Sequence, residues 1–269
     1  MNKTVLLTGG TDGIGFETAK RIVQAGHTLL LHGRSQSKLD GVQARLEALG
    51  HDATIHALRA DLSKLSEVRA LAKAVTDQCA ALDVLINNAG VFKVPSTTIE
   101  EGIDIRLMVN TIAPYVLTQA LLPMLSSDAR VINLSSAAQA PVNLQGWLSK
   151  TPMSDGDAYA QSKLAITMWT FHMAQMGRPD GPALIAVNPA SFLGSKMVKQ
   201  AYGSDGKSLS IGADILMRAA FDEVFGQASG RYFDNDQARF TDPHPDALNP
   251  DKNAALVAAL EQLIAELDG

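Results

Sequence analysis

Tyr159 and Lys163 stand four residues apart in the segment 157–164, which reads DAYAQSKL. On a helix, this spacing places the two side chains one turn apart on the same face. A free phenol has a pKa of about 10, but a neighbouring ammonium group favours the phenolate and lowers that pKa. The pair could therefore carry out general acid–base catalysis near neutral pH, although the same spacing also occurs on ordinary helix surfaces.

A glycine-rich turn lies near the N-terminus, where residues 8–15 read TGGTDGIG. It follows an apolar run at 4–8 and precedes a helical pattern at 14–25. Glycine allows backbone to approach a diphosphate closely, and the following helix N-terminus offers free N–H groups and a positive dipole end. A dinucleotide diphosphate is the expected ligand, and an ordinary strand-to-helix turn is the alternative. The expected contacts are Gly9, Thr11, Asp12, Gly13, Ile14 and Gly15.

The second apolar run, at 28–31, is followed by His32, Gly33 and Arg34. Enzymes that use NAD usually place an acid here to hold the ribose 2′-hydroxyl, whereas an arginine suits a 2′-phosphate. Arg34 therefore favours NADP(H), with NAD(H) possible. Asp12 is a counter-signal because its charge would repel a phosphate, and the alternative for Arg34 is a solvent-exposed side chain at a strand end.

Apolar runs alternate with amphipathic segments along most of the chain. Strands are expected at 4–8, 28–31, 53–58, 84–86, 131–134, 183–187 and 231–233, and helices at 14–25, 38–49, 67–79, 102–125, 158–176 and 251–267. This alternation predicts an α/β Rossmann fold: a three-layer, doubly wound parallel sheet of about seven strands with helices on both faces. The length of 269 residues fits a single domain, 1–269. Ligands of such sheets bind beyond the carboxyl ends of the strands, and Pro114 should kink its helix.

Composition argues against several other classes of protein. The net charge is −5, and no basic face of the kind that binds nucleic acid is visible. The single cysteine, Cys79, cannot form an intrachain disulfide and fits a reducing compartment. No unbroken apolar stretch of membrane-spanning length and no signal peptide are visible, so we expect a soluble, cytoplasmic protein. The six histidines lack metal-ligand spacing, and no catalytic metal is expected.

The sequence resembles the short-chain dehydrogenase/reductase family over nearly its whole length. The motifs occur in the order of the family: TGGTDGIG at 8–15, Asp61 after the third strand, NNAG at 87–90, Asn110, the serine pair 135–136 and YAQSK at 159–163. Within the family, SKLA at 162–165 and HPDAL at 244–248 are similar to the single-domain subgroup that includes retinol dehydrogenases and WW-domain oxidoreductase-like proteins.

The resemblance implies an NADP(H)-dependent oxidoreductase that interconverts a carbonyl and an alcohol by hydride transfer. Tyr159 would exchange a proton with the substrate oxygen, and Lys163 would tune Tyr159 and bind the nicotinamide ribose. Ser136 would hold the substrate oxygen, because the family usually uses the second serine of such a pair. Asn110 would anchor a water that links Lys163 to solvent, or would instead satisfy backbone at the Pro114 kink.

The resemblance also implies cofactor contacts beyond the glycine turn. These involve Asp61, Leu62, Asn87, Ala89, Gly90, Tyr159, Lys163, Pro189 and Ser195. Asp61 would accept a hydrogen bond from the adenine amino group, and Ser195 would replace a threonine that contacts the carboxamide. Ala190 departs from the family pattern, which usually has glycine after this proline, so the backbone near the nicotinamide is expected to differ.

Two segments could shape a substrate pocket. The insert at about 137–156 and the loop at about 190–215 carry apolar side chains: Trp147, Leu148, Met153, Phe192, Leu193 and Met197. They could wall a pocket for a medium or bulky apolar carbonyl or alcohol. Alternatively, Trp147 and Met153 only pin the insert to the body of the protein.

Two other functions share these motifs. A regulatory sensor could bind NADP(H) on the same fold without turnover, but it would need none of Asn110, Ser136, Tyr159 and Lys163. An epimerase or dehydratase of the extended branch would need a longer chain. By resemblance, the helices at 102–125 and 158–176 could form a homodimer or homotetramer, but their apolar faces could equally pack on the sheet.

Overall fold

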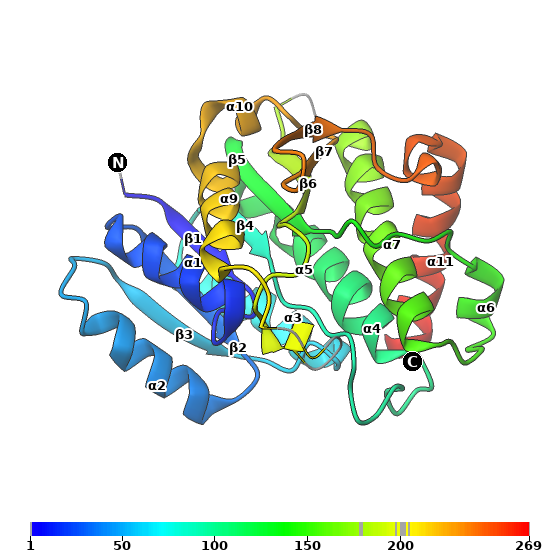
Figure 1. Ribbon diagram of the computed structural model, residues 1–269, viewed down its shortest axis with the longest axis horizontal. Helices are drawn as coiled ribbons and strands as arrows, with labels where there is room; N and C mark the ends of the chain where they lie inside the picture. The colour runs from blue at the N-terminus through cyan, green and yellow to red at the C-terminus, as the bar shows by residue number, and fades with distance from the viewer. Residues whose placement is uncertain (1, 178–179, 197, 200–202, 204, 269) are drawn as a thin grey trace.

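The computed structural model describes residues 2–177, 180–196, 198–199, 203 and 205–268. Within these residues, eight strands form one sheet in the order β3-β2-β1-β4-β5-β6-β7-β8 (Figure 1). The strands are β1 Thr4–Leu7, β2 Thr28–Gly33, β3 Ile55–Arg59, β4 Leu82–Asn87, β5 Leu125–Leu134, β6 Ala183–Asn188, β7 Arg231–Asp234 and β8 Arg239–Thr241. β1 to β7 are parallel, and β8 pairs antiparallel with β7. The predicted doubly wound fold is confirmed, with one short antiparallel strand more than expected.

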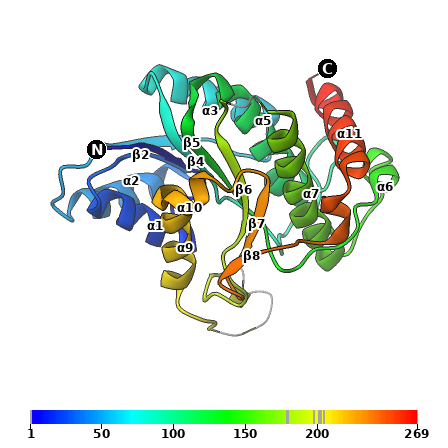
Figure 2. The same cartoon turned by 90° about the horizontal axis from the view of Figure 1, so that it is seen from above.

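Helices cover both faces of the sheet. They are α1 Gly13–Gln24, α2 Gln36–Glu47, α3 Leu65–Gln78, α4 Ile105–Leu107, α5 Ala113–Leu121, α6 Leu144–Leu148, α7 Asp155–Met176, α9 Leu209–Phe221, α10 Glu223–Gly226 and α11 Pro250–Asp268. One core cluster joins the sheet to α3, α5, α7 and α11, and the other joins it to α1, α2, α9 and α10. Figure 2 shows α9 and α10 on one side of the sheet and α5, α7 and α11 on the other.

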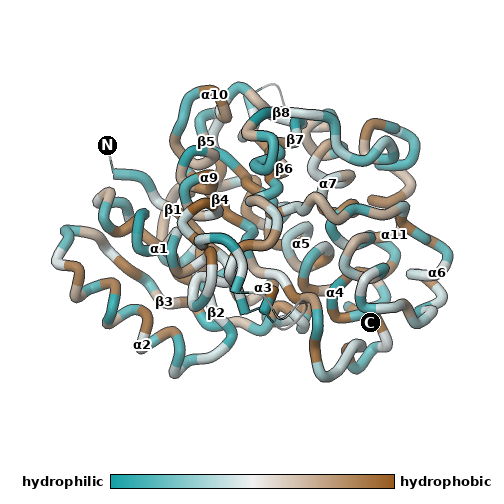
Figure 3. Tube along the Cα trace, in the orientation of Figure 1, coloured by the Kyte–Doolittle hydropathy of each residue, from teal (hydrophilic) through white to brown (hydrophobic). Residues whose placement is uncertain are grey.

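The central strands are buried on both faces, which explains why they are continuous apolar runs. In β1 and β2, Val5, Leu6, Leu7 and Leu29–Leu31 have no exposed surface. In Figure 3 the outer helix α2 instead alternates between hydrophobic and hydrophilic residues, as a helix with one buried face does. From β1 the chain builds outward to β3 and then crosses back to β4, so the strand order reverses beside β1. A crevice at the carboxyl ends of β1 and β4 is the usual ligand position in such a sheet.

The expected helix at 102–125 is broken into shorter pieces. Between α4 and α5, residues Met108–Ile112 form a π-helical segment, and a 3₁₀ turn, Leu122–Met124, follows α5. Pro114 has no N–H and therefore cannot donate to the carbonyl of Asn110, four residues earlier. Irregular turns of this kind often occur at functional sites.

The stretch Ile105–Met124 is long and apolar enough to cross a membrane by length and composition alone. However, 72% of its most apolar window is buried inside the protein. It belongs to the core cluster that includes α3 and α7, as core helices of globular proteins do.

Candidate active site

Four motifs that are far apart in the sequence meet at the carboxyl edge of the sheet. The glycine turn follows β1, NNAG begins in β4, the serine pair follows β5, and the first half of α7 carries Tyr159 and Lys163. Since β1, β4 and β5 are neighbours in the sheet, their carboxyl ends bring these motifs together.

Tyr159 and Lys163 lie on one face of α7, as their spacing predicts. The Lys163 ammonium nitrogen is 5.7 Å from the centre of the Tyr159 ring. It is buried and donates a 2.7 Å hydrogen bond to the carbonyl oxygen of Leu134. Burial lowers the pKa of Lys163 to about 8. The Phe92 ring packs on the Tyr159 ring, with the two ring centres 4.8 Å apart.

The two serines after β5 have different environments. Ser135 is buried, and its hydroxyl shares a 2.7 Å hydrogen bond with that of Thr167. Ser136 is partly exposed, and its hydroxyl oxygen accepts a 3.1 Å hydrogen bond from the Ala138 N–H. Ser135 is thus occupied in packing, and Ser136 is the serine of the pair that a ligand could reach.

Asn110 is buried in the π-helical segment and connects two motifs. Its Oδ1 accepts from the Val91 N–H at 2.8 Å, and its Nδ2 donates to the Val91 carbonyl at 2.9 Å. Nδ2 also donates to the Ser162 hydroxyl at 3.0 Å, and that hydroxyl donates to the Tyr159 carbonyl at 2.7 Å. The Asn110 side chain therefore satisfies backbone at Val91, just after NNAG, and ties it to the helix of Tyr159.

The glycine turn is shaped by contacts that exclude side chains. A Cβ on Gly9, where φ is +66°, would lie 2.8 Å from the Ala89 Cα, and one on Gly15 would lie 2.2 Å from the Gly9 oxygen. Gly13 has φ of +55°, but the nearest atom to its Cβ position is the Ser195 Cβ, 3.8 Å away. The turn is thus tightly packed beneath and less crowded at the start of α1, which fits the binding of a diphosphate.

Asp12 caps α1 by accepting a 2.8 Å hydrogen bond from the Gly13 N–H. Its other oxygen binds the Lys196 ammonium at 2.5 Å. Partial burial would raise the pKa of Asp12, but these hydrogen bonds and the charges of Lys196 and Lys38 lower it. The charge of Asp12, the counter-signal to a phosphate, is therefore paired within the protein.

The end of β2 explains why no acid occupies position 33. A Cβ on Gly33 would lie 2.5 Å from the Thr11 Cγ2 and 3.1 Å from the Leu39 Cγ, so the glycine turn packs directly on this residue. Arg34 is exposed, and within the described part of the chain no hydrogen-bond or ion-pair partner holds it. A cation beside the glycine turn is therefore free to bind an anionic ligand.

Asp61 and Leu62 follow β3 at the same edge of the sheet. Asp61 Oδ1 accepts from the N–H and hydroxyl of Ser63 at 3.0 and 2.8 Å, and the side chain stays partly exposed. Leu62 is buried, so its side chain supports the turn from within.

The Asn87 side chain has a structural role, and its predicted contact with the cofactor stays a prediction. Its side chain is buried and donates to Thr118 at 3.1 Å and to Asn133 at 2.8 Å, inside the core. Its neighbour Asn88, which our sequence reasoning passed over, donates to the carbonyls of Thr8 and Gly9 at 2.8 and 3.1 Å. The second asparagine of NNAG thus braces the glycine turn. A Cβ on Gly90 would lie 3.6 Å from the Lys163 ammonium nitrogen, so the end of NNAG lies close to Lys163.

The segment after β6 has an irregular backbone. Ala190, which departs from the family pattern, has φ of +115°. The preceding Pro189 carbonyl accepts a 3.0 Å hydrogen bond from the Asn235 side chain. Further on, the Ser195 Cβ lies 3.8 Å from the position that a Cβ on Gly13 would take, beside the glycine turn. Its predicted contact with the nicotinamide carboxamide stays a prediction.

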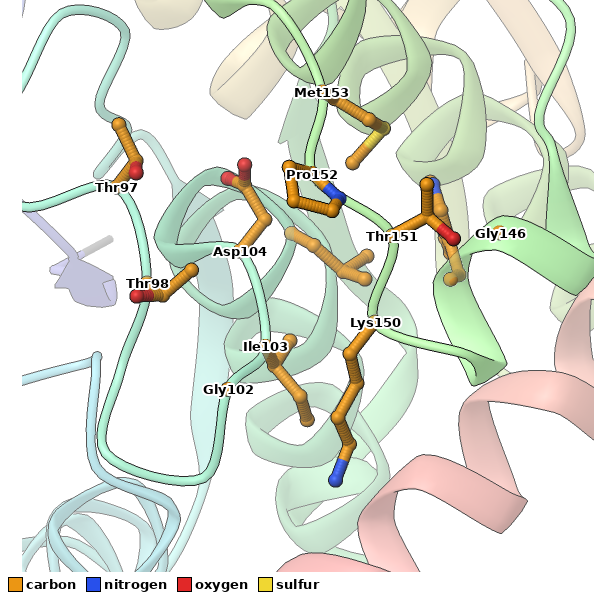
Figure 4. Close-up of a pocket in the computed structure, with 12 residues that line it drawn as sticks. Thr97, Thr98, Gly102, Ile103, Asp104, Gly146, Lys150, Thr151, Pro152 and Met153 are labelled. Carbon is orange, nitrogen blue, oxygen red and sulfur yellow. The ribbon is translucent and has the colours of Figure 1, made fainter.

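The apolar side chains that were expected to wall one pocket are dispersed. Trp147 is buried, and its indole N–H donates to Gln161 at 3.0 Å, which pins the insert to α7. Trp147 and Met153 line a cavity of about 50 Å³ between the insert and residues near Asp104 (Figure 4). Leu193 is buried, Phe192 is 55% exposed, and Met197 lies outside the described residues. The alternative interpretation of the insert, in which Trp147 and Met153 anchor it, fits these contacts better.

His32 is a second residue whose importance the sequence did not indicate. It is buried, accepts a 3.1 Å hydrogen bond from the Gly9 N–H at Nδ1, and lies 3.1 Å from the Ala60 carbonyl through Nε2. These partners assign the proton to Nε2, and burial lowers the pKa of His32 to about 4. The available signal was a polar residue inside an apolar strand. In the described residues, no group of three or more His, Cys, Asp or Glu could hold a metal ion.

Comparison with known proteins places the chain in a family. A family model for short chain dehydrogenases matches residues 3–205. Human polyprenol dehydrogenase is 31% identical over 193 residues, which cover 69% of this chain and 58% of that protein. Human retinol dehydrogenase 13 is 30% identical over 254 residues, which cover 86% of this chain and 76% of that protein.

Solved structures agree. A protein from Mycobacterium paratuberculosis superposes with a TM-score of 0.76 at 27% identity, covering 97% of this chain and 92% of that one. A short chain dehydrogenase from Burkholderia cenocepacia in complex with NADP gives a TM-score of 0.70 at 27% identity, covering 86% and 95%. The chain therefore belongs to the short-chain dehydrogenase family of NAD(P)-dependent oxidoreductases.

Proposed function

We propose that this protein reduces a carbonyl, or oxidises the corresponding alcohol, with NADP(H). The observation that carries the proposal is the convergence of Tyr159 and Lys163 with a reachable Ser136 beside the glycine turn. NADPH, when bound, supplies the hydride, and the protein supplies position and the proton.

Tyr159 donates that proton to the carbonyl oxygen during reduction. The Lys163 ammonium group, 5.7 Å from the Tyr159 ring, stabilises the phenolate that remains. Ser136 donates its hydroxyl hydrogen to the same substrate oxygen and so fixes the carbonyl. Positioned groups of this kind need only hydrogen-bond reach to act as general acids.

Asn110 acts through its backbone. Its side chain is fully occupied by Val91 and Ser162, so the carboxamide is not the group that binds a relay water. Pro114 has no N–H, so the donor four residues on from the Asn110 carbonyl is missing; the π-helical pattern leaves one donor five residues on, and a carbonyl oxygen can accept a second hydrogen bond. We assign the water that replenishes the Lys163 proton to this carbonyl.

The preference for NADP(H) rests on Arg34. Its exposed guanidinium beside the glycine turn suits the 2′-phosphate, and the charge of Asp12 is paired with Lys196. The Burkholderia cenocepacia relative was solved with NADP, in agreement with this assignment. Gly9, Gly13 and Gly15 hold the diphosphate, and Asp61 receives the adenine amino group.

The substrate we propose is an apolar carbonyl or alcohol. Phe92 presents an aromatic surface against Tyr159, next to where the reacting oxygen must lie. The chain is 30% and 28% identical to human retinol dehydrogenases 13 and 12, whose names give retinol, an apolar alcohol, as their substrate.

The test is oxidation of NADPH and NADH against a panel of aldehydes, ketones and quinones, with Tyr159→Phe alongside. Turnover with NADPH that falls at least about 100-fold in Tyr159→Phe supports the proposal. Tyr115→Phe is the matched control, because the Tyr115 hydroxyl donates to Glu261 on α11. This substitution should leave turnover unchanged.

A panel in which only small polar carbonyls react would contradict the proposed substrate class. If NADPH binds but no carbonyl is reduced and no alcohol is oxidised with NADP⁺, a regulatory sensor becomes the better assignment.

A further inference from the structure

Ala190 holds a backbone conformation that favours glycine. Its φ of +115° lies in the region that side chains with a Cβ rarely adopt. Phe192, two residues on, also has positive φ, at +57°. A residue stays in such a conformation only where the surrounding contacts hold it there.

The contacts come from the end of β7 and the start of the turn that leads to β8, residues 234–236, called here the hairpin turn. The Asp236 carboxylate accepts from the Ser191 N–H at 3.0 Å and from the Ser191 hydroxyl at 2.5 Å. It also accepts from the Asn188 side chain at 3.0 Å, and the Lys207 ammonium lies 3.6 Å away. One carboxylate thus binds the chain on both sides of Ala190.

The rest of the hairpin turn strengthens this clamp. Asp234 accepts from the Asn188 side chain at 2.8 Å and from the Asp236 N–H at 3.0 Å. Asn235 donates to the Pro189 carbonyl at 3.0 Å. Residues 188, 189 and 191 are therefore all bonded to the hairpin turn, and Ala190 between them has little freedom to relax.

The direction of the chain after Ala190 matters for the site. The segment runs to Leu193, which lies near Gly212 together with Ile14 at the start of α1: a Cβ on Gly212 would be 2.7 Å from the Leu193 side chain and 3.1 Å from that of Ile14. It then reaches Ser195, beside Gly13 of the glycine turn. The backbone angle at Ala190 thus helps to decide whether Leu193 and Ser195 lie against the glycine turn.

We propose that Asp236 is a positioning residue of the active site, which keeps Ala190 at positive φ and thereby seats residues 191–195 against the cofactor-binding turn. The expected effect on NADPH affinity rests on the proposed function, in which residues 189–195 border the cofactor. The clamp itself is a structural relationship that can be tested without any turnover.

The experiment compares the wild type, Ala190→Gly, Asp236→Ala and the double variant. Each is titrated with NADPH by fluorescence and unfolded by heat. Asp236→Ala should raise the NADPH Kd about tenfold, the equivalent of about 1.4 kcal/mol, because the segment relaxes away from the turn. Adding Ala190→Gly should recover most of that affinity, since glycine reaches positive φ without the clamp. This rescue restores no hydrogen bond to position 236, so a merely structural defect would not respond to it.

Thermal unfolding gives an independent readout. Ala190→Gly should raise the Tm of the wild type by about 2–4 °C by removing strain. It should leave the Tm of Asp236→Ala unchanged or lower, because Ala190 is no longer strained there. The exposed Asp242, six residues along, provides the control, and Asp242→Ala should keep both the wild-type Kd and the wild-type Tm.

Two results would overturn the clamp: equal stabilisation by Ala190→Gly in both backgrounds, or no recovery of NADPH affinity in the double variant. If Asp236→Ala does not fold, Ser191→Ala takes its place, with the same pattern expected at smaller size. If the wild type binds no NADPH, the proposed function fails, and the four Tm values still decide the clamp.

Discussion

The Lys163 ammonium nitrogen donates its 2.7 Å hydrogen bond to the carbonyl oxygen of Leu134, the last residue of β5. The strand end that delivers Ser136 is thereby fastened to the helix that delivers Tyr159. The same contact holds a positive charge in a buried position, where desolvation disfavours it.

We therefore predict that Lys163 makes the free energy of unfolding depend on pH in the alkaline range. Its pKa is about 8 in the folded protein and 10.5 ordinarily, so between these values the unfolded chain binds more protons. The free energy of unfolding should rise as pH increases through this window, by on the order of 3 kcal/mol from this group. Lys163→Met should flatten the rise and abolish turnover. Urea unfolding of both proteins from pH 7.5 to 10.5 measures the difference, and parallel pH dependences would refute it.

The second prediction concerns the Asn110 carboxamide, whose loss should lower both stability and kcat. Asn110→Ala leaves the buried Val91 N–H and carbonyl without partners, at about 1–3 kcal/mol each. Because the chain after NNAG is then released from the helix of Tyr159, kcat should fall more than the affinity for NADPH. Denaturant unfolding and steady-state kinetics measure the two effects.

Thr111→Val is the matched control for Asn110→Ala. It removes one buried hydrogen bond, from the neighbouring residue to the Ser162 carbonyl, and leaves Val91 untouched. It should cost about 1 kcal/mol and keep kcat. Equal losses of kcat in the two variants would mean that Asn110 acts only through general stability.

The sequence predicted the sheet well because buried parallel strands are recognisable apolar runs. β8 was missed, since its residues Arg239, Phe240 and Thr241 contain no such run. It forms because Phe240 packs on Phe233 and Phe225, with ring centres 5.1 Å apart in both pairs. This aromatic contact is tertiary, and local pattern does not reveal it.

In the candidate site, too, local sequence pattern predicts some features and tertiary structure decides others. The types and spacing of Tyr159 and Lys163 already specify their shared helix face. The NNAG motif does not indicate which asparagine faces the glycine turn, because that depends on where β4 ends. The strand ends at Asn87, whose side chain points into the core, and Asn88 beyond it meets the turn.

Arg34 carries the next prediction. Arg34→Leu should raise the Kd of NADPH about 10- to 100-fold, the value of a charge-assisted hydrogen bond, and leave the Kd of NADH unchanged. Fluorescence titration with both nucleotides measures this. Arg239→Ala, at an exposed arginine of β8, is the control and should alter neither value. Equal weakening of NADPH and NADH binding would show that Arg34 does not read the 2′-phosphate.

His32 predicts an acid-sensitive glycine turn. Its pKa is about 4 when folded and 6.5 ordinarily, so the unfolded chain binds more protons between these values, and stability falls as pH drops through this window. The loss should reach on the order of 3 kcal/mol, because burial disfavours the charged imidazolium and because a protonated Nδ1 can no longer accept from the Gly9 N–H. His32→Asn keeps an acceptor but does not titrate, so its unfolding free energy should fall less between pH 6.5 and 4. His51→Asn changes an exposed histidine and should retain the wild-type slope. Urea unfolding at several pH values decides the matter, and a His32→Asn slope equal to that of the wild type would show that carboxylates elsewhere cause the acid sensitivity.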